Sequence, residues 1–162
     1  MSIAFSVVDW IHVFTVVSKA HIAVYNVSNT TAIDFIDHGE LYTYRHVDSK
    51  KVQFHMAANR IRLGTHDDPK MIPSATKNGC TLINWKGIRI AIVTSSVPLD
   101  LETDILIIAN NSRKSIPGVK CKKIIIDSSN SFYLAERLLK ARTLPGVEVY
   151  SVAHGGAFQM SF

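Results

Sequence analysis

The stretch KIIIDSSNSFYLAERLLKARTLPGVEVYSV, residues 123–152, decides the fold, because it predicts a strand, a helix and a second strand joined by short connections. Its first five residues form the kind of apolar run that is typical of a buried central strand. In the helix, apolar and charged side chains fall on opposite faces. The apolar face is Phe132, Ala135, Leu138 and Leu139, and the charged face is Glu136, Arg137 and Lys140. The stretch therefore predicts a right-handed βαβ unit with parallel strands.

The segment between the first strand and the helix, Asp127-Ser128-Ser129-Asn130, supports two interpretations. Its oxygens suit a helix N-cap, and Pro145-Gly146 lies beyond the end of the helix. A strand end that opens a helix is also a place where α/β sheets bind ligands, and helix N-termini favour anions. We therefore keep an anion site at these four residues as a hypothesis beside simple capping.

Upstream of this unit, short segments rich in Val, Ile, Tyr and Phe predict further strands, including a β-meander and a hairpin around Lys86-Gly87. Spacing of Val52, Met56 and Leu63 predicts a helix over 49–63, and residues 65–78 are predicted to be a loop. The predicted strands are 21–27, 31–37, 41–45, 80–85, 88–93, 104–109, 123–127, 147–152 and 157–161. The predicted fold class is α/β with α+β character, with two main helices.

The 162 residues fit one domain, with 18 Lys and Arg against 13 Asp and Glu and a net charge of +5. Such a charge attracts polyanions such as nucleic acid or anionic lipid, although an ordinary basic surface explains it as well. The basic residues with the best claim to salt-sensitive DNA phosphate contacts are Arg113, Lys114, Lys120, Lys122 and Lys123.

Residues 1–19 form an apolar lead-in segment, and residues 20–162 form the domain itself. The apolar run 2–17 is shorter than the roughly 20 residues that cross a bilayer. It also lacks the basic start and cleavage site of a signal peptide. We expect a membrane-proximal linker or interfacial segment here. Cys80 and Cys121 are predicted to be free thiols, since their spacing suits neither a zinc site nor a redox pair.

Four short matches, in chain order, resemble the C-terminal domain of ComEC-type competence proteins, which are membrane proteins of DNA uptake. They are 25–27, 32–36, 124–130 and 149–158. The resemblance covers residues 20–162 and is closest to the shorter form found in Bacteroidetes-like bacteria. It implies a truncated metallo-β-lactamase-like domain, with mixed β-sheet layers and two main helices.

The metal motifs of the metallo-β-lactamase-like family have no equivalent here. Asn26 stands where the family has an Asp-Val-Gly-Gln-Gly-Asp motif, and Ser96 takes the place of a metal-bridging aspartate. Asn110 and Asn111 stand where two histidines would follow the next strand. Asn and Ser carry no charge to offset that of a catalytic metal. The resemblance therefore implies a degenerate domain without catalytic residues, metal or other cofactor.

The first functional hypothesis is a non-catalytic accessory domain of a DNA-uptake channel in natural transformation. It would be membrane-associated through an inner-membrane parent protein. Its partners would be the channel portion of the same or a neighbouring protein and single-stranded DNA, and no small-molecule substrate is identified. Two alternatives stay open. One is a divergent metal-dependent nuclease or phosphoesterase, and the other is a protein-interaction module built on segment 2–17. The nuclease would use Asp34, Asp37, Asp67, Asp68 or Asp127.

Overall fold

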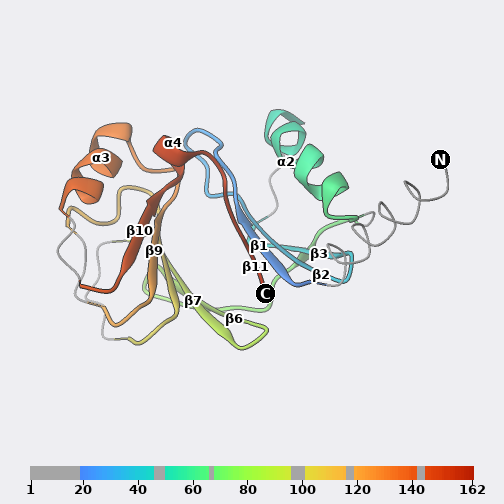
Figure 1. Ribbon diagram of the computed structural model, residues 1–162, viewed down its shortest axis with the longest axis horizontal. Coiled ribbons are helices and arrows are strands. Elements are labelled where there is room, and N and C mark those ends of the chain that lie inside the picture. Colours follow the sequence, from blue (N-terminus) through green and yellow to red (C-terminus); the bar gives the residue numbers. More distant parts are fainter. Residues whose placement is uncertain (1–18, 46–49, 66–67, 96–100, 116–118, 142–144) are drawn as a thin grey trace, which may run out of the picture.

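The computed structural model describes residues 19–45, 50–65, 68–95, 101–115, 119–141 and 145–162. In this part of the chain two mixed β-sheets face each other, and a helix covers the outer face of each (Figure 1). The mixed α and β character is thus confirmed. The first sheet has the order β11 (Phe158–Ser161), β1 (His21–Val24), β2 (Ile33–Asp37), β3 (Glu40–Thr43), β4 (Lys70–Met71). The second has the order β10 (Glu148–Ser151), β9 (Lys123–Ile126), β8 (Ile105–Ile108), β7 (Ile88–Val93), β6 (Cys80–Trp85), β5 (Ala75–Lys77). The helices are α2 (Lys50–Arg62), α3 (Phe132–Lys140) and α4 (Val152–Gly155).

The predicted meander and hairpin are both confirmed. Strands β1, β2 and β3 pair antiparallel in sequence order, and β6 pairs antiparallel with β7. Lys86 and Gly87 have φ of 51° and 84°, as a two-residue primed turn requires. Strand β1 ends at Val24, three residues earlier than predicted, and the loop that follows reaches the candidate site described below.

The predicted βαβ unit is also confirmed, with β10 parallel to β9 across α3. Strands β7, β8 and β9 are parallel as well, and every residue of β8 is buried. This burial explains the uniformly apolar sequence of β8, because the facing sheet covers one side and α3 covers the other.

The main core lies between the two sheets. Phe35 from β2 meets Trp85 from β6 with ring centroids 5.5 Å apart, and Ile92 and Ile107 are buried beside them. A second cluster packs α3 on the outer face of its sheet, and a third packs Met56 of α2 on Ala23. The order of layers is therefore helix, sheet, sheet, helix (Figure 1).

The start of α3 differs from the prediction. Phe132 is exposed, and Leu134 takes its place on the buried face, because Phe132 lies in the first turn and stacks instead on His154 at 4.2 Å. The N-cap is Ser131, whose Oγ accepts from Leu134 N at 3.3 Å. The expectation that Ser128, Ser129 or Asn130 caps the helix was therefore wrong.

The predicted loop 65–78 contains two short strands that the sequence pattern does not reveal. Strand β4 pairs with β3, and β5 pairs with β6. All five of their residues are exposed, so they form through backbone pairing at sheet edges and leave no apolar periodicity. The single turn α4 was also not predicted. Cys80 and Cys121 are free thiols, as predicted, and segment 2–17 lies outside the described residues.

Candidate functional site

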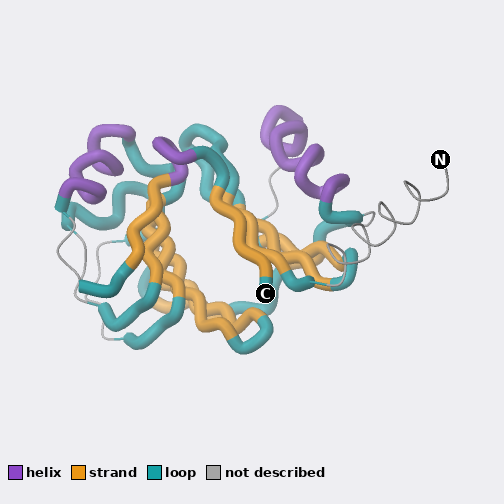
Figure 2. Tube along the Cα trace, in the orientation of Figure 1, coloured by secondary structure: helices purple, strands orange, loops and turns teal. Residues whose placement is uncertain are grey.

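The carboxyl ends of β7, β8 and β9 meet at one edge of the second sheet, where Val93, Ile108 and Ile126 are in register. The segments that follow β8 and β9 therefore lie together. The loop between β1 and β2 reaches the same edge (Figure 2). The structure thus brings predicted residues from three segments to one place, which we call the loop edge. They are Asn26, Asn110, Asn111 and the segment Asp127-Ser128-Ser129-Asn130. Ser96 lies outside the described residues.

Asp127 is a fully buried carboxylate at the loop edge. Its Oδ1 accepts hydrogen bonds from Ser129 N at 3.0 Å, Ser129 Oγ at 2.5 Å and Asn130 Nδ2 at 3.0 Å. Its Oδ2 has no hydrogen-bond partner among the described residues. Burial raises the pKa of Asp127 to about 6, against the opposing effect of the hydrogen bonds from Ser129.

Ser128 ties the β1–β2 loop to the loop edge. Its Oγ accepts from Val27 N at 3.0 Å and lies 2.8 Å from the carbonyl oxygen of Val27. The carbonyl oxygen of Ser128 accepts in turn from Asn29 N at 3.1 Å. These contacts bridge about a hundred residues of sequence and join the first sheet to the second. The role of Ser128 is thus to hold two loops together.

Asn110 and Asn111 are also held by the segment after β9. Asn110 N donates to Ser129 Oγ at 2.7 Å, and Asn111 N donates to Asn130 Oδ1 at 2.9 Å. Both asparagines have positive φ, 55° and 52°, a conformation that asparagine tolerates better than most residues. The side chain of Asn111 accepts from Ser131 N at 2.8 Å. That bond occupies one of the helix-terminal donors that the predicted anion site would use.

The five predicted DNA-contacting residues do not form one patch. Arg113 and Lys114 follow β8, and the Lys114 carbonyl accepts from Arg137 of α3 at 2.8 Å. The other three lie at the opposite end of the parallel strands, at or before the start of β9. There Lys122 pairs with Asp104 at 2.9 Å, and Lys120 forms a backbone bridge with Glu102.

Lys123 lines a groove of about 830 Å³ between α2, β10 and β11, the outer strands of the two sheets. Its Nζ pairs with Glu148 at 2.9 Å and lies 4.9 Å from the ring centre of Phe158. Other charged and aromatic side chains of the groove are Tyr25, His55, Arg62 and Tyr150. The groove thus combines cations with aromatic rings, and the sequence alone did not reveal this combination.

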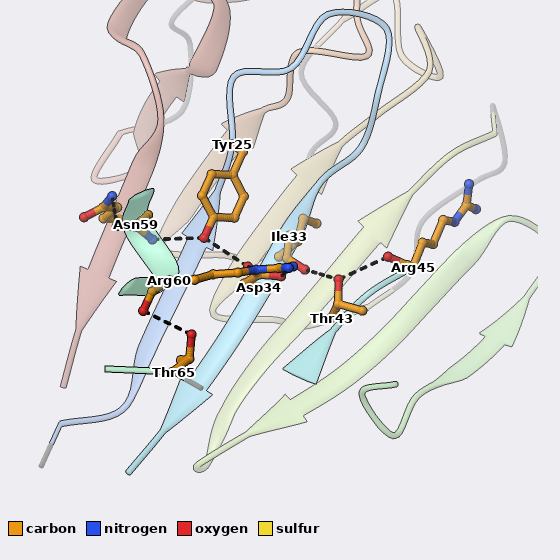
Figure 3. Close-up of polar contacts among 9 residues, drawn as sticks. Tyr25, Ile33, Asp34, Thr43, Arg45, Asn59, Arg60 and Thr65 are labelled. Atoms are coloured by element: carbon orange, nitrogen blue, oxygen red, sulfur yellow. Dashed lines mark hydrogen bonds and ion pairs between the residues drawn. The ribbon is translucent and has the colours of Figure 1, made fainter. Parts of the chain in front are cut away.

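One wall of this groove rests on a buried polar network around Asp34 of β2 (Figure 3). Arg60 of α2 grips both oxygens of Asp34, with Nε–Oδ2 at 2.7 Å and Nη2–Oδ1 at 2.9 Å. Tyr25 also donates to Asp34 Oδ2 at 3.0 Å, and Asn59 donates to Tyr25 at 2.9 Å. Burial, together with the charge of Asp34, raises the pKa of Tyr25 above its ordinary value. The network therefore fastens α2 to the first sheet.

The carboxylates of the nuclease alternative lie on different elements. Asp34 faces α2, and Asp37 at the end of β2 pairs with Lys86 and His38. Asp127 lies at the loop edge, Asp68 is exposed just before β4, and Asp67 is outside the described residues. Among the residues that are described, no three His, Cys, Asp or Glu side chains are grouped so that they could hold a metal ion.

Comparison of the sequence with known protein families identifies the family of this chain. A model of the ComEC C-terminal domain matches residues 22–162. The chain belongs to this family. No curated protein and no solved structure matches the chain. Membership of the ComEC family connects this domain with DNA uptake by a membrane protein. Within the described part of this ComEC domain, no helix is long and apolar enough to cross a membrane.

Proposed function

We propose that this ComEC domain is a non-catalytic accessory domain of the DNA-uptake channel, which supports channel assembly or handles single-stranded DNA. The observation that carries the proposal is that polar side chains of the loop edge are already engaged in hydrogen bonds within the protein. The side-chain oxygens of Asn111 and Asn130 accept hydrogen bonds from backbone N–H groups, and Ser128 and Ser129 link the loops. Side chains engaged in this way hold loops rather than a metal ion.

The chemistry of metal-dependent hydrolysis supports the same proposal. A hydrolytic site needs several charged or imidazole ligands around an open coordination position. Asp127 is the one carboxylate that the described residues place at the loop edge, and three hydrogen bonds already occupy its Oδ1. A single carboxylate with amides and hydroxyls around it does not offset the charge of a divalent ion.

We expect the purified chain to contain no stoichiometric metal and to leave DNA uncleaved with magnesium, manganese or zinc. Metal analysis of protein prepared without chelators, and a nuclease assay with single- and double-stranded DNA, measure this. Asp127→Asn is the matched variant. Bound metal together with cleavage that Asp127→Asn abolishes would favour the nuclease alternative and refute the proposal.

The groove beside Lys123 supports the handling of single-stranded DNA, because Lys123 and Arg62 can meet phosphates there and the rings of Tyr150 and His55 are at least partly exposed for bases. We expect Lys123→Ala combined with Arg62→Ala to weaken binding of an oligothymidylate. The slope of log affinity against log salt concentration should become less steep by about 1.4, since each of the two lost phosphate contacts contributes about 0.7 to its magnitude. Glu148→Gln should tighten binding, because Glu148 is the carboxylate that lines the groove.

Fluorescence anisotropy with a labelled oligothymidylate over a range of salt concentrations measures both effects. The matched control removes two cations outside the groove, Lys86→Ala with Lys140→Ala. Equal losses in the groove variant and in this control would mean that only net charge matters. In that case the groove would have no part in DNA binding.

A further inference from the structure

Helix α2 has apolar side chains on two opposite faces. Met56 is buried against the first sheet, next to Ala23 and Tyr25. Phe54 and Ile61, in contrast, are 77% and 73% exposed. These are among the most exposed large apolar side chains in the described part of the chain. Packing among the described residues therefore leaves most of the surface of these two side chains exposed.

The geometry of a helix puts these two residues on one line. Phe54 and Ile61 are seven residues apart, close to two full turns, so they lie one above the other. Ala58, which is also exposed, lies between them. Phe54 and Met56 are two positions apart, about 200° around the axis, so the exposed line lies opposite the buried face. We call Phe54, Ala58 and Ile61 the outer ridge.

The charge around the outer ridge has one sign. Helix α2 contains Lys50, Lys51, Arg60 and Arg62 and no Asp or Glu. Arg60 points inward to Asp34, and Arg62 donates to Asn59 and Gln159 at the groove, whereas Lys50 and His55 are exposed without such contacts among the described residues. Two exposed apolar side chains on a helix that carries only positive charges match an anionic membrane surface, where apolar groups enter the headgroup region and cations meet lipid phosphates. Nucleic acid would match the cations, and a base would stack on Phe54, but nucleic acid would gain little from covering Ile61.

We propose that the outer ridge of α2 docks this domain on an anionic lipid surface, with Phe54 and Ile61 inserted among the headgroups. Lys50 would lie at the level of the lipid phosphates. Helix α2 lies on the outside of the first sheet, away from α3 (Figure 1). This inference goes beyond the proposed function, because it needs no DNA contact and no metal.

The test is flotation of the full chain with vesicles of phosphatidylcholine, with or without phosphatidylglycerol. We expect the wild type to bind the anionic vesicles and to bind neutral ones far less. Phe54→Gln with Ile61→Gln should lower the partition coefficient by about tenfold or more, because the inserted apolar area is lost. Lys50→Gln should lower it by about fivefold. Glutamine is a good helix former, so α2 should remain intact.

The matched control removes two exposed aromatic side chains from the other main helix, Phe132→Gln with Tyr133→Gln, and should change partitioning less than twofold. The proposal is overturned if the wild type does not bind anionic vesicles, or if the control loses as much as the α2 variant. It is also overturned if the α2 variant binds vesicles as the wild type does, which would assign membrane binding to another segment such as 2–17. A loss of oligothymidylate binding with vesicle binding unchanged would assign the ridge to nucleic acid instead.

Discussion

Arg60→Met is expected to lower the free energy of unfolding by about 3–5 kcal/mol, the cost of leaving a buried charge without its partner. The carboxylate of Asp34 is fully buried, and Arg60 supplies two of the three side-chain hydrogen bonds that it receives. Among the described residues, only the hydroxyl of Tyr25 would then still donate a side-chain hydrogen bond to Asp34, and the aliphatic side chain of methionine cannot replace the guanidinium. Guanidinium denaturation followed by circular dichroism measures the loss.

Arg62→Met is the matched control, because Arg62 lies on the same helix but is exposed, and exposed polar contacts contribute about 0–1 kcal/mol. Asp34→Asn with Arg60→Met should recover most of the lost stability, since removing both members of a buried pair leaves no charge unpaired. A loss below about 1 kcal/mol for Arg60→Met would mean that the pair does not fasten α2 to the first sheet.

Much of the sheet structure could be predicted from sequence, because buried strands carry their signal locally. The apolar runs of β8 and β9, and the hairpin around Lys86-Gly87, were found where the sequence predicted them. Strands β4 and β5 were missed, since their residues are exposed and their pairing is a backbone property. The face of α3 was placed incorrectly at Phe132, because the position of a helix start depends on tertiary contacts such as the stacking on His154.

The candidate site was predictable only in part. That Asp127 follows a buried strand places it at a sheet edge, and this holds for Asn110 and Asn111 as well. The contacts of Ser128 with Val27 span 101 residues, and no local pattern encodes them. No local pattern encodes the bond between Asp34 and Arg60, or the groove that Lys123 and Arg62 both line. Sequence therefore identified the residues of one edge, while the fold alone decided what each contacts.

Asp127 should make the stability of this domain fall as the pH rises from about 4 to about 6. Its pKa is raised to about 6 in the folded state, compared with about 3.9 in an unfolded chain, so protonation favours folding. This contribution is fully present below the unfolded pKa and is lost as the pH rises through the folded pKa. The difference of roughly two units corresponds to about 3 kcal/mol.

Asp127→Asn carries no charge at any pH, so its stability relative to the wild type should grow by about 3 kcal/mol between pH 4 and pH 7. Guanidinium denaturation of both proteins at several pH values gives this difference, and the other carboxylates cancel from it. Asp104→Asn is the control of opposite sign, because backbone and Lys122 hydrogen bonds lower the pKa of Asp104 to about 2. Asp104 therefore stabilises the fold above about pH 4, and this stability is lost as the pH falls toward 2.

The same titration also separates the two functional hypotheses. A divalent ion at the loop edge would bind the ionised form of Asp127, so adding manganese would lower its pKa and stabilise the wild type at neutral pH. An accessory domain whose asparagines and serines hold loops should show the same pH profile with and without the ion. If the difference in free energy of unfolding between wild type and Asp127→Asn stays constant from pH 4 to pH 7, the pKa of Asp127 is not raised by burial. A pH profile that shifts when manganese is added would show that the loop edge binds a metal ion and would favour the nuclease alternative.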